Sequence, residues 1–337
     1  MAETREPVRV LVTGAGALLG QGVIRSLLDS DRGPFEVIAA DPSPLSAGLY
    51  WTDERYLLPL AAAPDFVDAV EELIARTRPD VVIPGTDVEL MPLALQRARL
   101  EAAGTHVLVA SPDVVRIADD KYETARFFAE HGFEPPASCL PGGEDELLRT
   151  VDFPLIVKPR RGARSVGVRK VFDRTALARA IAETDEPVIQ DCIGDDAAEY
   201  TAGTITFGGR CEAAIVMRRD LRDGNTYRAF VEQSETLLAD VRAFAEALGA
   251  HGPANFQFRL VDGRPRVFEI NARFSGTTPL RALAGFDEVG MCIDHLLRGQ
   301  PVTQPAVRDV TILRHWSETV LEPGTVPPTP VRSATRA

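Results

Sequence analysis

The stretch ANFQFRLVDGRPRVFEINARFSGTT, residues 254–278, decides the fold of this chain. Polar and apolar residues alternate on both sides of Asp262-Gly263, a dipeptide that favours a hairpin turn because glycine tolerates positive φ. Since successive strand side chains point to opposite faces, the alternation predicts a β-hairpin with one polar and one buried face. The polar row contains Asn255, Gln257, Glu269, Asn271 and Arg273. The residues expected to face a core are Phe256, Phe258, Phe268 and Ile270.

Three residues of the polar row suit a site for a metal ion and a phosphate group. Carboxylate and amide oxygens, as on Glu269 and Asn271, are ligands that Mg²⁺ takes together with substrate phosphates. Arg273, two residues further on, can bind a phosphate oxygen. The alternative is an ordinary hairpin whose polar face contacts water. Residues elsewhere in the chain favour the first interpretation.

The composition indicates an acidic globular protein. The 337 residues carry a net charge of -12, which argues against a general nucleic-acid binder, and the length allows about two or three domains. The scattered cysteines have no CxxC spacing and are expected to be buried thiols in a reducing compartment. The N-terminus has no signal-peptide pattern and the chain no apolar run of about eighteen residues. We therefore expect a cytoplasmic protein that does not cross a membrane.

A strand–turn–helix–strand pattern opens the chain. Val8–Val12 is an apolar run, a turn with Gly14, Gly16 and Gly20 follows, and a second apolar run ends at Asp41. The pattern predicts a βαβ unit and resembles a dinucleotide-binding fingerprint, in which Asp41 would hold a ribose. The third glycine comes one position late. We favour a turn in a nucleotide-like fold that binds no dinucleotide.

Helix and strand patterns continue to alternate up to residue 110, which predicts a parallel sheet. Such sheets bind ligands at the carboxyl ends of their strands. Thr86, Asp87 and Glu89 follow a buried strand at 81–84, so these residues are candidates for substrate contact. For Asp87, capping of the following helix is an equal alternative.

Two lysines and a glycine-bearing loop come next. Lys121 starts a helix, and Lys158 ends a strand. The segment 160–168, here called the glycine loop, contains Gly162 and Gly167 and leads into another strand. Such a loop can fold its backbone N–H groups over phosphates, and a lysine can place a charge on a phosphate oxygen. The segment is not a Walker A motif, because no Lys-Ser or Lys-Thr pair follows Gly167. A mobile basic hairpin loop is the alternative.

A basic cluster in the second half of the chain is a candidate anion site. Arg218, Arg219 and Arg222 precede a glycine turn in an otherwise acidic protein. The alternative is a face in contact with water. The other features of this half are a strand at 187–193 and a further strand that begins at Glu199.

The candidate residues occur in a specific order along the chain. The order is Asp120-Lys121, Val157-Lys158-Pro159 with its loop, Gln190 to Ile193 with Glu199, Gln257, and Glu269-Ile270-Asn271-Ala272-Arg273. In this order the chain resembles the ATP-grasp superfamily, and within it the carbamoyl-phosphate-synthase-like branch, over residues 8–316. The resemblance implies an α/β and α+β fold class, with an N-terminal Rossmann-like parallel-sheet domain followed by a two-subdomain ATP-grasp fold. The implied parts are 1–110 for the N-terminal domain, 111–190 for the small subdomain with the phosphate loop, 191–321 for the subdomain with the metal hairpin, and 322–337 for a flexible tail.

The resemblance also implies roles for the matching residues. Contacts with the ATP phosphates are implied for Lys121, Lys158, Ser165 and Gly167. Adenine and ribose contacts are implied for Gln190, Asp191, Ile193 and Glu199. Mg²⁺, with Mn²⁺ as a substitute, would be bound by Gln257, Glu269 and Asn271. Catalytic contacts with the transferred phosphoryl group are implied for Lys158, Arg219 and Arg273. Substrate contacts are expected near Thr86, Asp87, Glu89, Ser275, Gly276 and Thr277.

Three departures from the family pattern bear on these roles. Arg164 stands in the glycine loop where relatives often have a small residue. Gln257 stands where many ATP-grasp enzymes place an acid. We call the three implied metal ligands, Gln257, Glu269 and Asn271, the metal row, and Glu269 is its one anionic member. The chain has a single ATP-grasp unit and lacks the tandem second half of a carbamoyl-phosphate synthase, so that activity is not predicted.

The activity implied by the resemblance is an ATP-dependent ligase that joins a small-molecule carboxylate to an amine. The carboxylate would be activated as an acyl phosphate with release of ADP, and the amine would then displace phosphate. A loop that closes over the phosphates would exclude water. A homodimer is expected for such enzymes. The alternatives are an NAD(P)-dependent oxidoreductase or epimerase that uses the Gly14 to Gly20 turn, and a nucleotide-binding module without catalysis.

Overall fold

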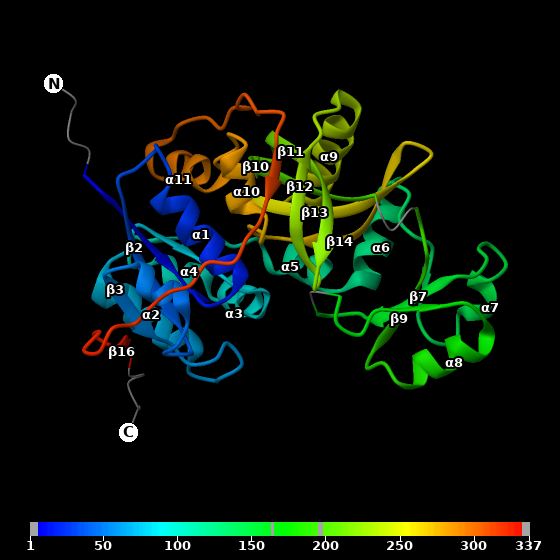
Figure 1. Ribbon diagram of the computed structural model, residues 1–337, viewed down its shortest axis with the longest axis horizontal. Coiled ribbons are helices and arrows are strands. Elements are labelled where there is room, and N and C mark those ends of the chain that lie inside the picture. The colour runs from blue at the N-terminus through cyan, green and yellow to red at the C-terminus, as the bar shows by residue number, and fades with distance from the viewer. Residues whose placement is uncertain (1–5, 163–164, 195–197, 332–337) are drawn as a thin grey trace.

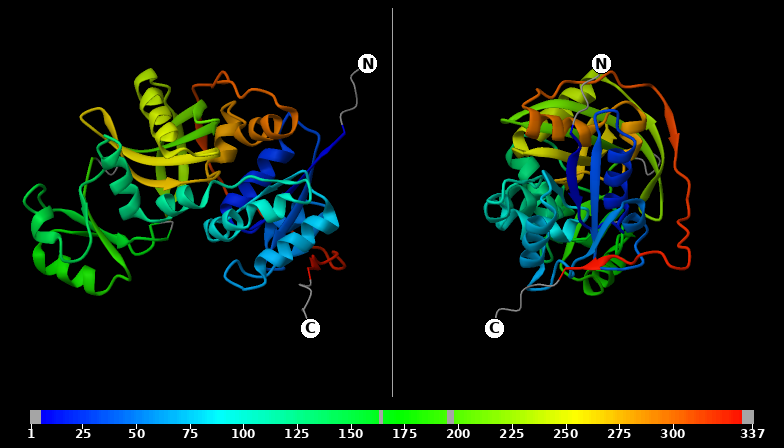
Figure 2. Two further views of the ribbon diagram at one scale, coloured as in Figure 1. Left: turned by 180° about the vertical axis from the view of Figure 1, so that it is seen from behind. Right: turned by 90° about the vertical axis from the view of Figure 1, so that its left-hand side faces the viewer.

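The computed structural model describes residues 6–162, 165–194 and 198–331. Figure 1 shows three bodies in a row, with the N-terminal domain at one end, a large sheet in the middle and a small sheet at the other end. The reverse view in Figure 2 shows the same order. The predicted architecture, a parallel-sheet domain followed by a second part in two subdomains, is confirmed.

The N-terminal domain is built on a six-stranded parallel sheet with the order β16-β3-β2-β1-β4-β5. Its strands are β1 (Val8–Val12), β2 (Phe35–Asp41), β3 (Glu54–Leu57), β4 (Val81–Ile83), β5 (His106–Val107) and β16 (Thr329–Pro330). Its helices are α1 (Leu18–Leu28), α2 (Phe66–Thr77), α3 (Leu90–Leu95) and α4 (Arg97–Glu101), with short 3₁₀ turns η1 (Ala47–Trp51) and η2 (Asp87–Glu89). The central strands are apolar and buried, as expected for a parallel sheet with helices on both faces.

The large sheet has six strands in the order β14-β13-β10-β11-β12-β15. They are β10 (Glu199–Phe207), β11 (Arg210–Arg222), β12 (Asn225–Val231), β13 (Gly252–Val261), β14 (Arg264–Asn271) and β15 (Thr311–Leu313). One face packs on the helices α5 (Pro112–Asp119), α6 (Lys121–Glu130) and α9 (Glu235–Leu248). The other face shares a core with α1 and with the helices α10 (Thr278–Leu283) and α11 (Glu288–Arg298). This second core joins the large sheet to the N-terminal domain.

The small sheet is antiparallel and has the order β6-β9-β7-β8. Its elements are β6 (Ser138–Cys139), α7 (Glu144–Leu147), β7 (Leu155–Pro159), β8 (Arg169–Val171), α8 (Arg174–Ala182) and β9 (Pro187–Asp191). Leu155, Val157, Leu177 and Ile189 belong to a core that is separate from the other two. The small sheet is therefore a subdomain in its own right, and it carries the glycine loop between β7 and β8.

The hairpin predicted at 254–278 is present as β13 and β14 with Asp262-Gly263 at the turn. Asn255 pairs with Asn271, and Gln257 pairs with Glu269. The polar residues of the two strands therefore lie opposite one another, and the predicted polar row is confirmed.

A β-bulge in the same hairpin corrects the expected position of Phe268. The pairing register shifts between Gln257 and Phe258, and Val267 is the residue opposite Phe258. Val267 is buried in the core, whereas Phe268 is the extra residue and lines a cavity on the polar side. Strict alternation placed Phe268 in the core because a bulge leaves no mark in the hydrophobic period.

Two expected boundaries also differ from the structure. The small subdomain was expected to begin at 111, but α5 and α6 pack against the large sheet, where Phe128 contacts Phe244 and Phe256 edge-on. The tail was expected to be mobile from 322, but β16 pairs with the edge strand β3 and Val331 is buried. A strand of two residues in a proline-rich segment is too short for an alternating pattern of polar and apolar residues to reveal it.

Candidate active site

Two cavities meet between the three bodies. The first lies between the small and large sheets, and the second, of about 980 Å³, lies between the large sheet and the N-terminal domain. Lys121, Arg161, Gly162 and Glu269 line both cavities. The two cavities therefore adjoin at these residues.

Most of the residues predicted to bind a nucleotide line the first cavity. They are Lys121, Lys158, Ser165, Gln190, Asp191, Ile193, Glu199, Arg219, Gln257 and Glu269. Gly167 lies next to them, since a Cβ added to it would be 3.0 Å from the ring of Pro159 in the cavity wall. Ile156, Val168 and Phe268 supply apolar walls. The cavity thus has both apolar and charged side chains in its wall.

Lys158 is buried at the end of β7 and faces the first cavity. Burial lowers the pKa of Lys158 to about 7, although the charge of Glu269 opposes this shift. The Lys158 Nζ lies 5.4 Å from the centroid of the Phe268 ring. A buried amine near its titration point becomes charged when an anion such as phosphate arrives beside it.

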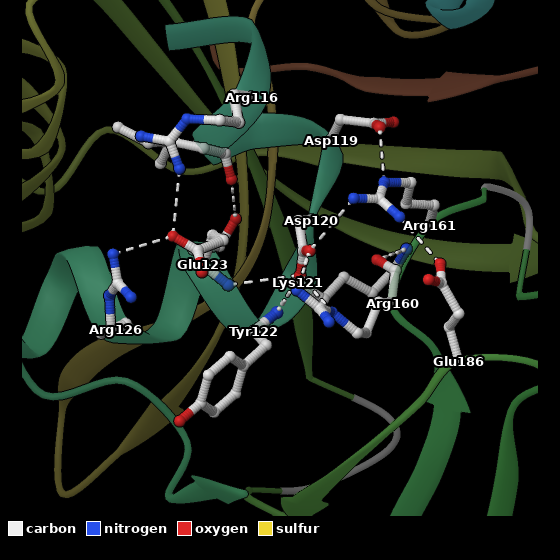
Figure 3. A network of polar contacts seen from close by, with 12 residues as sticks. Arg116, Asp119, Asp120, Lys121, Tyr122, Glu123, Arg126, Arg160, Arg161 and Glu186 are labelled. Atoms are coloured by element: carbon white, nitrogen blue, oxygen red, sulfur yellow. Dashed lines mark hydrogen bonds and ion pairs between the residues drawn. The ribbon is translucent and has the colours of Figure 1, made fainter. Parts of the chain in front are cut away.

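The start of the glycine loop is tied to the N-terminus of α6 (Figure 3). Asp120 caps α6 by accepting two backbone N–H groups, and it also accepts hydrogen bonds from Arg160 Nε at 3.1 Å and Nη2 at 2.5 Å. Burial alone would raise the pKa of Asp120, but these hydrogen bonds outweigh it and the pKa is lowered. The Lys121 Nζ donates to the carbonyl oxygen of Gly162 at 2.7 Å. Arg164 lies outside the described residues.

The residues predicted to bind a metal ion converge on Glu269. Its Oε1 accepts hydrogen bonds from Gln257 Nε2 at 2.9 Å and Asn271 Nδ2 at 3.3 Å. One carboxylate and two amides are hard ligands with a single negative charge, and this set fits Mg²⁺ when phosphate oxygens complete the coordination. No group of three or more His, Cys, Asp and Glu among the described residues could hold a metal ion.

Two predicted arginine contacts surround this metal row. Arg219 Nη2 lies 2.6 Å from Glu199 Oε1 and 2.6 Å from Gln257 Oε1, and its side chain is buried. Glu199 and Arg219 face each other across β10 and β11. The pair fixes both the carboxylate predicted to bind ribose and the amide predicted to bind metal.

Arg273 connects the metal row to the N-terminal domain. Its Nε and Nη2 donate to the two carboxylate oxygens of Asp87 at 2.8 and 2.6 Å, and Nη2 also donates to Asn271 Oδ1 at 2.8 Å. This bidentate pair joins residues that are 186 positions apart in the chain. It holds the guanidinium at the wall of the second cavity, where Thr86, Asp87 and Gly276 also lie.

The structure corrects three of the expected substrate contacts. Glu89 is buried and accepts the backbone N–H groups of Gly85 at 3.1 Å and Thr86 at 3.0 Å. Burial raises the pKa of Glu89 to about 7, although these hydrogen bonds oppose the shift. Ser275 and Thr277 are buried, with their hydroxyl oxygens 2.5 Å apart. The side chains of Glu89, Ser275 and Thr277 therefore form hydrogen bonds within the protein and do not face a substrate.

The glycine turn of the N-terminal domain is closed by its own contacts. Asp41 Oδ2 accepts the backbone N–H of Gly16 at 2.7 Å, and Asp41 Oδ1 accepts the hydroxyl of Ser46 at 2.6 Å. A Cβ added to Gly20 would overlap the carbonyl oxygen of Gly14. The glycines thus allow close packing of the backbone. The carboxylate predicted to hold a ribose, Asp41, instead accepts hydrogen bonds from Gly16 and Ser46. The alternative of an NAD(P)-dependent oxidoreductase or epimerase is not supported.

Several cavity residues were not predicted from the sequence. Arg161 lines both cavities and pairs with Asp119 at 3.3 Å and Glu186 at 2.8 Å. Its position beside Arg160 in a basic loop was the available signal. Arg314 and Trp316, from the C-terminal part of the chain, line the second cavity, and no local pattern marks them.

Two family models match separate parts of the chain. Residues 196–319 match ATP-grasp in the biosynthetic pathway with Ter operon, and residues 10–108 match the PylC-like N-terminal domain. The first match contains the metal row and the hairpin, and the second contains the parallel sheet. No helix among the described residues has the length and hydropathy needed to cross a bilayer.

Curated relatives include large chains of carbamoyl phosphate synthase. The chain is 28% identical to that of Gemmatimonas aurantiaca over 309 residues, which cover 82% of this chain and 27% of the relative. It is 27% identical to that of Streptomyces coelicolor over 310 residues, which cover 83% of this chain and 28% of the relative. The chain therefore spans less than a third of the length of these relatives.

Solved structures with the same fold include two ligases. N5-carboxyaminoimidazole synthetase of Staphylococcus aureus, complexed with ADP, matches with a TM-score of 0.68 at 14% identity and covers 91% of this chain and 82% of that one. L-amino acid ligase of Bacillus licheniformis matches with a TM-score of 0.66 at 19% identity and covers 90% and 76%. At these identities the likeness concerns the fold. Residues 196–319 are thus similar to an ATP-grasp family and residues 10–108 to a PylC-like N-terminal domain, and the chain has the fold of these solved ligase structures.

Proposed function

We propose that this chain is an ATP-dependent ligase that joins a carboxylate to an amine. The observation that carries the proposal is the junction of the two cavities beside Lys121 and Glu269. ATP occupies the first cavity with its γ-phosphate at this junction, and the acid and amine occupy the second. The ATP-grasp match and the ligases among proteins of the same fold support this assignment.

In this proposal the protein supplies position and charge rather than a covalent nucleophile. Lys158 and Lys121 neutralise phosphate oxygens, and Arg219 orients Glu199 and Gln257. Mg²⁺ held by Glu269 and its two amide neighbours would neutralise charge on the transferred phosphoryl group. Charge spreads over the phosphoryl oxygens during transfer, so fixed cations at the junction stabilise the transition state.

The reaction proceeds in two steps. A carboxylate oxygen bonds to the γ-phosphorus while the bond to the β,γ-bridging oxygen breaks, which gives an acyl phosphate and ADP. The amine nitrogen then bonds to the carbonyl carbon, phosphate leaves, and the nitrogen loses a proton. Arg273, fixed by Asp87, contacts the phosphoryl group or the acyl phosphate. Closure of the glycine loop excludes the water that would hydrolyse this intermediate.

ADP release across a panel of small carboxylates and amino acids tests the proposal. We expect release to require a carboxylate and a divalent ion, and we expect a hydroxamate when hydroxylamine replaces the amine. ADP release that is the same with and without every carboxylate would reject a ligase. Binding of NADPH without binding of ATP would also reject it.

Several finer assignments belong to the same proposal. Mg²⁺ as the natural ion, a homodimer and a cytoplasmic location are expected for a ligase of this kind and stay predictions. Comparison of Mg²⁺ and Mn²⁺ in the ADP assay tests the ion, and sedimentation of the purified protein tests the dimer.

A further inference from the structure

The outer end of the second cavity is built by a segment that lies beyond the metal row. β15 pairs with β12, and the backbone N–H of Arg314 donates to the carbonyl oxygen of Tyr227 at 3.0 Å. The chain then continues to β16 at the edge of the N-terminal sheet, as Figure 1 shows. We call residues 311–331 the strap. Its residues Arg314, His315 and Trp316 line the second cavity.

Arg314 is a half-buried cation that forms no ion pair with an acid among the described residues. Its guanidinium donates to two backbone carbonyl oxygens, those of Thr226 at 2.9 Å and of Gly276. Burial lowers the pKa of Arg314 to about 10, and the charge of Arg25 adds to this shift. No carboxylate of the described part of the chain forms an ion pair with Arg314. Removing a guanidinium from water is costly unless a negative charge compensates it. The two carbonyl oxygens accept two of the five N–H groups of Arg314, so the other N–H groups are available to a ligand.

A second arginine faces the same end of the cavity. Arg222, at the end of β11, lines the cavity, and its guanidinium carbon lies 5.4 Å from the centroid of the Tyr227 ring. The nearby Asp220 pairs with Arg218 at 3.6 Å and Arg228 at 3.4 Å instead. Asp223 also lines the cavity, and within the described residues it forms no ion pair with either cation. The local charge at this end is therefore positive.

Apolar and aromatic side chains line the same cavity as these two cations. Trp316 and Val88 line the cavity from opposite bodies and are 80% and 71% exposed. Leu18 of the N-terminal domain and Tyr227 of the large sheet add further apolar surface. Large apolar side chains exposed at the rim of a cavity provide contact area for the apolar part of a ligand.

We propose that Arg222, Tyr227, Arg314 and Trp316 form a subsite for the carboxylate of an aromatic or bulky apolar substrate. In this proposal the strap subsite holds a carboxylate other than the one that becomes an acyl phosphate at Glu269 and Arg273. At least one of the two ligase substrates therefore carries a carboxylate besides its reacting group. The inference rests on the proposed ligase function, because that function assigns the second cavity to the acid and the amine.

Fluorine NMR of the full chain labelled with 5-fluorotryptophan can test the subsite. The protein has two tryptophans, Trp51 and Trp316, and therefore gives two resonances. The resonance that remains in the Trp51→Phe variant is that of Trp316. Phenylacetate is titrated as the aromatic carboxylate, and phenylacetamide as its neutral counterpart, both without nucleotide. We expect phenylacetate to shift the Trp316 resonance saturably and the amide to bind at least about ten-fold more weakly.

Variants of the strap separate recognition by charge from a change in folding. Arg314→Gln is expected to weaken phenylacetate binding by at least about ten-fold, and Arg314→Lys by less, because it keeps the charge. Arg308→Gln is the matched control, because Arg308 lies nearby in the sequence and also donates to a backbone carbonyl oxygen, that of Leu283. It should bind phenylacetate as the natural protein does. Thermal melting verifies that each variant is folded.

The outcomes that reject the subsite differ from those that reject the ligase. No saturable shift of Trp316, an equal response to phenylacetamide, or unchanged binding by folded Arg314→Gln would overturn the subsite. These measurements contain no ATP, so they are independent of ADP formation. Phenylacetate binding that depends on Arg314, in a protein that never forms ADP, would reject the ligase and leave the subsite in place.

Discussion

Two glycine-bearing connections follow strands of this protein, and they differ in how their backbone is used. In the turn after β1, Gly16 N–H is held by Asp41, Ala15 N–H by the carbonyl oxygen of Ala40, and a Cβ on Gly20 would overlap Gly14. In the glycine loop after β7, a Cβ on Gly162 would meet no atom within 4 Å. Glycine allows close packing in the first case, whereas at Gly162 the space for a side chain is open. A glycine pattern alone therefore cannot distinguish a packed turn from a binding loop.

The turn after β1 and the glycine loop also differ in the role of a buried titratable side chain beside each of them, Glu89 and Lys158 respectively. Burial raises the pKa of Glu89 to about 7 beneath the turn, and burial lowers the pKa of Lys158 to about 7 beside the loop. Glu89 accepts backbone N–H groups within the N-terminal domain, whereas Lys158 faces a cavity. A strongly shifted pKa thus belongs to a group engaged within the fold in one place and to a candidate ligand-binding group in the other.

Removal of charge beside the loop should have the largest effect. Glu269→Gln is expected to lower Mg²⁺-dependent ADP formation about 1,000-fold, or about 4 kcal/mol, because the metal row loses its anion. The fold should persist, since the glutamine can keep contacts with Gln257 and Asn271. Steady-state ADP release measures the loss.

Asp41→Asn is the matched control for this prediction, because it removes a carboxylate beside the turn. It should leave the rate of ADP formation within about two-fold and cost about 1 kcal/mol of stability through a weakened hydrogen bond. Full activity in Glu269→Gln would refute the metal assignment, and a large loss of activity in folded Asp41→Asn would mean that the turn contributes to the reaction.

A methyl group added in the turn should have the next largest effect. Gly20→Ala is expected to lower the free energy of unfolding by about 3 kcal/mol, because its Cβ meets the backbone of Gly14. Gly162→Ala should lower it by only about 1 kcal/mol and raise the KM for ATP, because an alanine at φ of +116° is strained although its Cβ meets no other atom. Urea denaturation compares the two variants. Equal losses of stability would contradict the distinction between packed turn and open loop.

The hairpin of residues 254–278 shows what sequence patterns can predict. Period-two alternation and an Asp-Gly turn predict two strands and which polar residues share a face, whereas the pairing of Gln257 with Glu269 depends on a bulge. The exception is Phe268, which a bulge moves from the core to the cavity wall. The bulge depends on pairing between strands, and a single strand carries no sign of it.

Contacts between distant segments set the limit of sequence reasoning at the candidate site. Asp87 and Arg273 were each singled out, but nothing local indicates that they form a bidentate pair across 186 positions. Arg314 is a single arginine in an irregular segment, and its significance comes from its place in a cavity wall without an ion pair to any described acid, which only the folded chain reveals. Glu89 was expected at a substrate because it follows a strand, and its burial is again a tertiary property.

Glu89→Gln should change how stability depends on pH. The folded-state pKa is raised from 4.5 to about 7, so between these values the folded protein binds more protons than the unfolded chain, and stability falls as pH rises. The contribution lost is about 2 to 3 kcal/mol by pH 8. The variant should lack this fall, because a glutamine can accept the same N–H groups without a charge. Urea denaturation at pH 5 and pH 8 measures the difference, and parallel pH profiles for the two proteins would contradict it.

Lys158→Arg should give the smallest effect, a change in proton uptake when a nucleotide binds. With a pKa of about 7, Lys158 is mostly neutral at pH 8, and phosphate oxygens beside it would raise this pKa. Binding of Mg-ADP should therefore take up about 0.9 proton at pH 8, which calorimetry in two buffers of different ionisation enthalpy detects. Arginine stays charged, so the variant should bind with little uptake. Equal uptake by both proteins would show that Lys158 is not the group that meets the phosphates, and the glycine loop would then lose its main difference from the turn.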